Sequence, residues 1–240
     1  MIKVYLMKTE EFKNEEIFRQ GCGLVDSVRL QKIKKCRATE DKVRSLCCGL
    51  LLQYAVKEEL EAEKLPVGKI PMELCYGISQ HGKPYFTDFP GLYFNLSHSG
   101  EYTALVVSKQ EVGIDIQQKR SVKDRMVQKV LSKSEYERYK ALQKEESDAQ
   151  EQPGDNGQNW FFRCWCAKES YGKLTGMGLL QGFDTMVYEP EQKRISDTTG
   201  NYAFCREYCI ETEYFINVCC YEKEDFPEEV TYLTFSHILS

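Results

Sequence analysis

A weak internal repeat constrains the fold most, because a helical segment and a strand-like segment each occur twice along the 240-residue chain. The helical sequence RSLCCG at residues 44–49 can be aligned with RCWCAK at residues 163–168. The strand-like sequence YTALVV at residues 102–107 can be aligned with YFINVC at residues 214–219. Such self-similarity predicts two copies of one structural unit. We expect an α+β fold with a pseudo-twofold arrangement of two similar halves, each a small, mainly antiparallel sheet packed on a long helix.

We place the boundary of the halves near residue 110, so that the N-terminal half spans residues 1–109 and the C-terminal half spans residues 110–240. Apolar periodicity predicts helices at residues 42–61, 123–143 and 160–174. It predicts strands at residues 2–7, 91–96, 102–108, 112–117, 183–188, 202–207 and 215–221. A polar insert at residues 144–159 is predicted to be a loop.

Charge and hydropathy exclude several classes of protein. The formal charge of −5 argues against a general nucleic-acid binder. The N-terminus becomes polar too early for a signal peptide, and the longest apolar run, residues 46–52, is too short to span a bilayer. The eleven cysteines include no C-x-x-C pair, so we predict no zinc site and interpret most of them as small buried residues. We expect a cytoplasmic protein that acts on neither nucleic acid nor membrane.

The segment WCAKESYGK at residues 165–173 is predicted to be helical and places Glu169 and Lys173 four residues apart on one face. Aromatic residues around this pair are typical of a core, so the charges would lie at its edge. The alternative is an ordinary surface ion pair, which stabilises a helix by only about 0.2–0.5 kcal/mol.

Asp115 lies in the strand-like sequence VGIDIQ at residues 112–117. Because strand residues alternate between two faces, Gly113, Asp115 and Gln117 share one face. A buried carboxylate needs a cation or a partner. If Glu169 approaches Asp115, two carboxylates and the Gln117 amide oxygen would form an all-oxygen site of the kind that suits Mg²⁺. The alternative is an edge strand whose polar face lies in water.

Three further segments carry groups that can bind phosphate. Hydroxyl and imidazole groups occur together in the sequence NLSHS at residues 95–99, although an ordinary turn has the same composition. Basic residues precede the helix predicted at residues 42–61, which has Arg44 and Ser45 near its start, although a solvated charged face is the commoner fate of such a run. Pro84 fixes a turn after Gly82, and Lys83 in that turn could reach a phosphate or lie in solvent. No P-loop, G-x-G-x-x-G or G-x-S-x-G occurs, so the residues favour a Mg²⁺-dependent site for a polyphosphate compound.

Four motifs in this order and spacing resemble the signature of the Sfp-type 4′-phosphopantetheinyl transferases. They are GKP at residues 82–84, FNLSHS at 94–99, GID at 113–115 and W-x-x-KES-x-x-K at 165–173. The resemblance runs from the basic segment near Lys32 to residues 225–228, which is most of the chain. It implies an enzyme that transfers the 4′-phosphopantetheine arm of coenzyme A to a serine of an apo carrier protein and releases adenosine 3′,5′-bisphosphate.

The resemblance also implies roles for individual residues. Asp115, Glu169 and, as the weakest of the three, Gln117 would ligate Mg²⁺, because many family members have an acid where this chain has Gln117. Glu169, Lys173 and His98 would be catalytic, with Glu169 as the base for the carrier serine. Coenzyme A would be bound by Lys32, Lys35, Arg37, Ser45, His81, Gly82, Lys83, Pro84, Asn95, Ser97, His98, Ser99, Lys168 and Lys173. The N-terminal half would hold the 3′-phosphate and adenine, and the C-terminal half would hold Mg²⁺ and the catalytic residues.

Three hypotheses follow, and the transferase comes first. The second is a catalytically impaired protein that binds coenzyme A or a carrier protein, and Gln117 is the only sequence feature that favours it. The third is a general α+β interaction protein.

The partners expected of a transferase are apo carrier domains of peptide, polyketide or fatty-acid synthases, with residues 122–142 and 144–159 on the docking side. Two fused halves predict a monomer.

Overall fold

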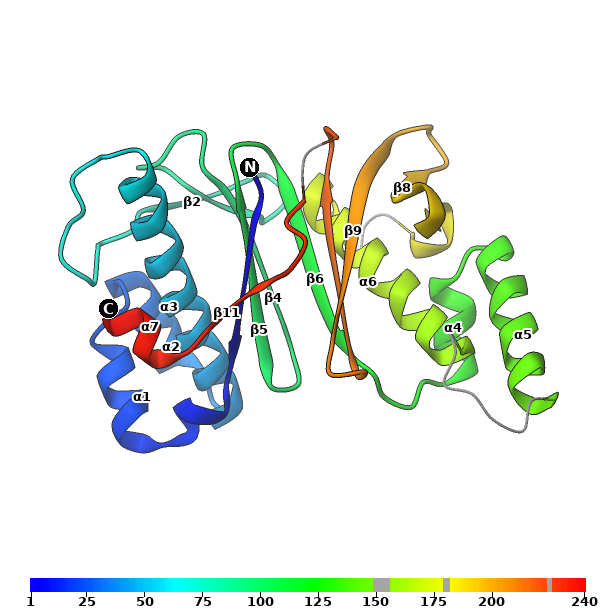
Figure 1. The fold of residues 1–240 in the computed structure, drawn as a ribbon, viewed down its shortest axis with the longest axis horizontal. Coiled ribbons are helices and arrows are strands. Elements are labelled where there is room, and N and C mark those ends of the chain that lie inside the picture. Colours follow the sequence, from blue (N-terminus) through cyan, green and yellow to red (C-terminus); the bar gives the residue numbers. More distant parts are fainter. Residues whose placement is uncertain (149–155, 179–181, 224–225) are drawn as a thin grey trace. The chain divides into compact units, whose positions relative to one another are not determined.

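Two sheets and two long helices organise the chain in the computed structural model (Figure 1). The structure describes residues 1–148, 156–178, 182–223 and 226–240. The chain forms two compact units. Unit 1 comprises Met1–Ser79, Pro84–Gln110 and Phe226–Ser240, and unit 2 comprises Gln80–Lys83 and Glu111–Asp225.

Unit 1 contains a four-stranded sheet made by β1 (Lys3–Lys8), β4 (Tyr93–Ser99), β5 (Tyr102–Ser108) and β11 (Thr231–Leu233). The strand order is β11–β1–β5–β4. Strand β5 is antiparallel to both β1 and β4, whereas β11 joins β1 in parallel. Two short strands, β2 (Tyr76–Ile78) and β3 (Pro84–Phe86), form a separate antiparallel pair.

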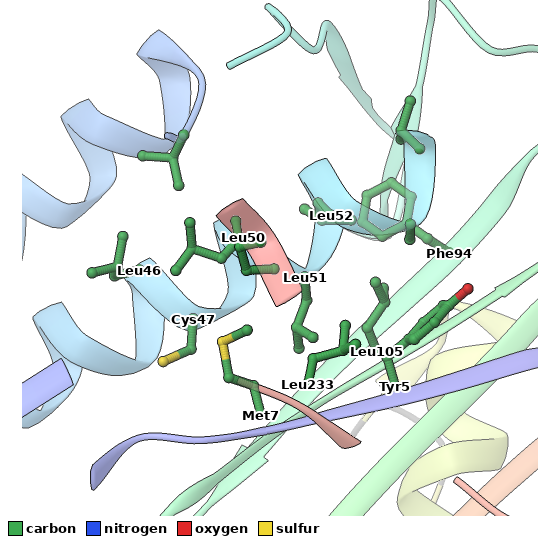
Figure 2. Close-up of a cluster of buried hydrophobic side chains, with 14 of the residues drawn as sticks. Tyr5, Met7, Leu46, Cys47, Leu50, Leu51, Leu52, Phe94, Leu105 and Leu233 are labelled. Carbon is green, nitrogen blue, oxygen red and sulfur yellow. The ribbon is translucent and has the colours of Figure 1, made fainter. Parts of the chain in front are cut away.

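The helices of unit 1 are α1 (Glu15–Cys22), α2 (Ser27–Lys35), α3 (Thr39–Ala62) and α7 (Phe235–Leu239), with a 3₁₀ turn at Glu10–Lys13. Helix α3 fills the core, because buried and mostly apolar residues occupy its middle turns, from Val43 to Val56. Figure 2 shows Leu46 and Leu51 of this helix in the cluster that also contains Met7 of β1 and Leu105 of β5. All four side chains are buried, so α3 is held against the sheet by the hydrophobic effect.

Unit 2 contains a five-stranded antiparallel sheet in the order β6–β10–β9–β8–β7. Its strands are β6 (Val112–Gln118), β7 (Met186–Glu189), β8 (Arg194–Asp197), β9 (Tyr202–Ile210) and β10 (Tyr214–Cys220). Its helices are α4 (Asp124–Val130), α5 (Lys133–Asp148) and α6 (Gly157–Thr175), with 3₁₀ turns at Phe183–Thr185 and Pro190–Gln192. Helix α6 packs on the sheet through buried residues such as Phe162, which stacks on Phe215 of β10.

The predicted fold class is confirmed, since each unit has a mainly antiparallel sheet packed on one long helix, α3 or α6. The helix predicted at residues 123–143 is two helices, because the chain is extended at Leu131 between α4 and α5. Part of the predicted loop at residues 144–159 is helical, and residues 149–155 lie outside the described part of the chain. Residues 226–240, assigned from sequence to the C-terminal half, supply β11 to the sheet of unit 1.

The cysteines are mostly buried and all eleven are free, as predicted for small core residues. None of the helices within the described ranges has the length and apolar composition needed to cross a membrane.

Candidate functional site

Asp115 and Lys173 lie at the centre of a charged site in unit 2. Asp115 is in the middle of β6, opposite Asn217 of β10, and its side chain is 4% exposed. Lys173, in the last turn of α6, donates from Nζ to Asp115 Oδ1 over 2.7 Å and to the carbonyl oxygen of Ile114 over 3.1 Å. Strand β6 is an edge strand of its sheet, yet the carboxylate is buried, and the ion pair offsets the cost of removing that charge from water.

Gly113 explains how helix α6 comes so close to this strand. A Cβ atom at Gly113 would lie 2.1 Å from the backbone oxygen of Ser170 and 2.6 Å from the backbone nitrogen of Leu174. Any other residue would therefore push the helix away from the strand. Residues on the same face of β6 as Gly113, among them Asp115, are thus held against the last two turns of α6.

Glu169 of α6 and Gln117 of β6 also belong to this site. Glu169 precedes Lys173 by one helical turn, and Trp165 Nε1 donates to its Oε1 over 3.4 Å. Burial, followed by the charge of Asp115, raises the pKa of the Glu169 carboxyl, and Lys173 opposes this shift. Gln117 Nε2 donates to Asp115 Oδ2 over 2.7 Å. The structure therefore brings the three predicted metal ligands together around Asp115.

The donor atoms of this site fit a hard cation. Burial and, after it, the neighbouring charge of Asp115 raise the pKa of Glu169, and a divalent ion would relieve the repulsion between the two carboxylates. Rotation of the Gln117 amide would present its oxygen in place of its nitrogen. Among the described residues, no three His, Cys, Asp or Glu side chains gather closely enough to hold a metal. Two carboxylates and an amide suit Mg²⁺, which binds proteins through one or two carboxylates and takes its other ligands from phosphates and water.

Lys168 has a different environment from its neighbour Glu169. Its side chain is fully buried, and its ammonium donates to the carboxylate of Glu135 and to the carbonyl oxygens of Val130 and Phe183. An ammonium has three donors, and all three have partners within the protein. This arrangement favours a structural role over the coenzyme A contact that the sequence predicts for Lys168.

The segment containing His81, Gly82 and Lys83 belongs to unit 2. Gly82 has φ of +85°, which requires glycine, and His81 is exposed. Lys83 forms an ion pair with Glu111 and donates to the carbonyl oxygens of Val112 and Leu174, over 3.2 and 3.3 Å. Its cation thus lies at the C-terminus of α6, where helix carbonyls attract positive charge, and not freely in solvent.

A pocket of about 550 Å³ lies within unit 1, lined by residues of α2, α3, β2, β3 and β4. It brings together five of the predicted coenzyme A-binding residues, namely Lys32, Ser45, Pro84, Asn95 and His98. Residues 95–99 are part of strand β4, so the turn considered as an alternative is wrong for them. Of the other predicted residues in unit 1, Lys35, Arg37, Ser97 and Ser99 lie outside the lining.

The pocket combines positive charge with apolar walls. Arg29, Lys32 and Arg44 line it, as do the side chains of Tyr76 and Phe94. The Oγ atom of Ser45 is buried and has no hydrogen-bond partner among the described residues. A concave site of this composition suits an anion that also carries an aromatic ring.

Arg29 was not among the residues selected from the sequence. It precedes Lys32 by three residues on α2, so the helical period places both on one face. That spacing was a usable signal, whereas the apolar pocket residues Tyr76 and Ile78 come from β2, which sequence analysis did not predict.

Comparison with known proteins gives matches in both halves. Residues 111–224 match the model of the 4′-phosphopantetheinyl transferase superfamily, and residues 14–110 match the model of the 4′-phosphopantetheinyl transferase N-terminal domain. The chain is 26% identical to the 4′-phosphopantetheinyl transferase Sfp of Bacillus subtilis, over 99% of this chain and 100% of that protein. It is 26% identical to the transferase psf-1 of Bacillus pumilus, over 100% of this chain and 98% of that protein. It is 31% identical to HetI of Nostoc, over 47% and 46% of the two chains.

Proposed function

Because the chain belongs to the 4′-phosphopantetheinyl transferase superfamily and is such a transferase, we propose that Asp115 and Glu169 hold the Mg²⁺ ion of the reaction. The observation that carries this assignment is the convergence of Asp115, Glu169 and Lys173 between β6 and α6. We assign Gln117 as the weakest ligand, since an amide oxygen bears no net charge.

The enzyme transfers the 4′-phosphopantetheine arm of coenzyme A to a carrier protein. A bond forms between the carrier serine oxygen and the phosphorus of the arm, and the bond from that phosphorus to the bridging oxygen of the pyrophosphate breaks. Adenosine 3′,5′-bisphosphate leaves. Such a transfer depends mainly on positioning and on charge stabilisation. When bound, Mg²⁺ would neutralise charge on the pyrophosphate oxygens.

Lys173 and Glu169 supply what this chemistry needs from the protein. The ammonium of Lys173 stabilises the negative charge that develops on the leaving phosphate. Glu169 accepts the proton of the carrier serine, directly or through water, and its carboxylate is oriented by Trp165. In unit 1 we assign the pocket lined by Lys32, Ser45 and His98 to the adenine and the 3′-phosphate of coenzyme A. Lys35 and Arg37, both exposed, add to the positive charge that attracts this anion.

The carrier proteins that this enzyme modifies are proposed to be apo domains of peptide, polyketide or fatty-acid synthases. The predicted docking segments, residues 122–142 and 144–159, contain α4 and α5, while residues 149–155 lie outside the described residues. The monomeric state and the cytoplasmic location stay predictions.

Mass spectrometry tests the function directly. An apo carrier of each class is incubated with this protein, coenzyme A and Mg²⁺, and we expect the carrier to gain the mass of the phosphopantetheine arm. Removal of Mg²⁺ with a chelator should stop the gain, and added Mg²⁺ should restore it. Coenzyme A binding with no mass gain on any carrier class would instead identify a protein that binds the ligand without transferring it.

A further inference from the structure

Asn217 of β10 is a buried polar residue beside Asp115. It is 1% exposed, and the register of β10 and β6 places it directly opposite Asp115. Its Oδ1 accepts from the hydroxyl of Ser170 on α6 over 3.0 Å, so its side chain lies on the sheet face that this helix covers. Its Nδ2 has no hydrogen-bond partner among the described residues. Asn217 therefore carries an unused N–H donor next to the charged site.

The neighbours of Asn217 fix which end of its amide is unpaired. Besides Ser170, the thiol of Cys219 donates to its Oδ1 over 3.3 Å, so two donors hold the oxygen at that end. A buried amide N–H without an acceptor costs the full free energy of its desolvation, whereas an apolar side chain of similar volume has no such cost. The Nδ2 donor is thus available for an acceptor that changes its partners when substrate binds.

Two carboxylates flank Asn217 across the sheet, and they differ in how firmly they are held. Glu207 lies opposite Asn217 on β9, and Arg163 of α6 binds its carboxylate through two hydrogen bonds of 2.9 Å. Asp115 is held by Lys173, whose ammonium we assign to the leaving phosphate. When Lys173 turns to that phosphate, Asp115 Oδ1 loses a donor. Paired residues on one sheet face have Cβ atoms about 4.5–5.5 Å apart, so the Asn217 amide can reach this carboxylate.

We propose that Asn217 is a positioning residue, whose amide donates to the carboxylate of Asp115 when Lys173 contacts the substrate and so keeps that carboxylate aimed at the metal. Carboxylates that ligate metals are themselves held by hydrogen bonds from residues that do not touch the metal. This inference rests on the proposed function, which assigns Mg²⁺ to Asp115 and Glu169. It gives a residue of β10, outside the four signature motifs, a share in the metal affinity of the enzyme.

Electron paramagnetic resonance tests the assignment without turnover, by titrating Mn²⁺ into the protein with coenzyme A present and no carrier. Asn217→Leu keeps the side-chain volume and removes the donor, and we expect its Kd for Mn²⁺ to rise about 10- to 100-fold. Urea unfolding should show no loss of stability, because the leucine replaces an unpaired buried donor. Asn217→Ala, which cannot overpack the core, should show the same rise in Kd. Asn201→Leu, at an exposed asparagine, is the control and should bind Mn²⁺ as wild type does.

Two comparisons separate this inference from the proposed function. Calorimetry with adenosine 3′,5′-bisphosphate and a chelator should give Asn217→Leu the same nucleotide affinity as wild type. A variant that loses Mn²⁺ affinity only together with stability and nucleotide affinity would show a structural role, and the inference would fail. If both Asn217 variants bind Mn²⁺ as wild type does while Asp115→Asn binds it weakly, the inference fails and the proposed metal site stands. If Asp115→Asn retains wild-type affinity for Mn²⁺, the proposed metal site fails, and the inference fails with it.

Discussion

Lys173 Nζ lies 2.7 Å from Asp115 Oδ1, so an ion pair joins the last turn of α6 to the middle of β6. The acid of this pair is almost fully buried, whereas the lysine side chain is 26% exposed. Two elements that are far apart in the sequence thus present one acid and one base at the same place. The geometry of the site is set by the contact between Lys173 and Asp115, and not by the i,i+4 spacing of Lys173 and Glu169.

Substitution of Lys173 should affect catalysis more than folding. Lys173→Met removes the charge that we assign to stabilising the leaving phosphate, and kcat/KM for coenzyme A should fall by about 100- to 1000-fold. Lys173→Arg should retain more activity because it keeps the charge. Lys69→Met, at an exposed loop lysine of unit 1, should behave like wild type. Steady-state kinetics would check this, with each variant assayed at the same concentration of folded protein as wild type. A fall in kcat/KM of less than tenfold for Lys173→Met would contradict the prediction.

The proposed metal ligands should differ in importance. Asp115→Asn removes a charged oxygen ligand, and we expect a loss of transfer rate of about 100-fold or more together with a higher Mg²⁺ requirement. Gln117→Ala removes only a neutral amide, whose place a water can take, and should cost about tenfold or less. Rates measured across a Mg²⁺ titration check the order. Equal losses in the two variants would overturn the ranking.

The residues of this site were predictable because strand and helix periods fix which side chains share a face. The two-residue period of β6 placed Asp115 and Gln117 together, and the helical period placed Glu169 with Lys173. The family resemblance of the sequence motifs then indicated that β6 and α6 contribute residues to one site. The fold class was predictable for a different reason, since the internal repeat aligns a segment of α3 with a segment of α6.

Contacts between distant segments were not predictable, because they leave no mark on local periodicity. From the sequence, Lys168 was predicted to bind coenzyme A, like other residues of its motif. Its partner in the structure is Glu135, which lies in another helix and could not be identified from the sequence. Strand β11, from the end of the chain, pairs with β1 from its beginning. Arg29 resembled any exposed basic residue of α2, and only tertiary packing shows that it is buried.

Gly113 should be intolerant of substitution. In Gly113→Ala the added Cβ would meet backbone atoms of Ser170 and Leu174, which cannot rotate away. We expect a loss of stability of about 1–3 kcal/mol or more, as for overpacked cores, and reduced transfer activity as α6 moves from Asp115. Gly68→Ala is the control, because its Cβ would lie at an ordinary 3.6 Å from Met72. Urea unfolding of both variants measures the difference, and equal stability would show that α6 can shift freely.

The ion pair between Lys168 and Glu135 should stabilise unit 2 without taking part in catalysis. Glu135 Oε2 accepts from Lys168 and from the backbone nitrogen of Ser132, and its Oε1 accepts from the backbone nitrogen of Tyr188. Lys168→Met leaves this carboxylate buried without its cation, so unfolding should become easier by about 3–5 kcal/mol. In the double variant with Glu135→Gln no uncompensated charge remains, so it should be more stable than Lys168→Met alone.

A double-mutant cycle by urea unfolding measures that coupling, and kinetics give a second readout. Folded Lys168→Met should keep a nearly wild-type KM for coenzyme A, because all three donors of the ammonium have partners within the protein. Lys173→Met is the comparison for a residue at the reacting phosphate. A variant at Lys168 that kept full stability and raised KM many-fold would instead identify Lys168 as a coenzyme A ligand, as the sequence motif alone suggests.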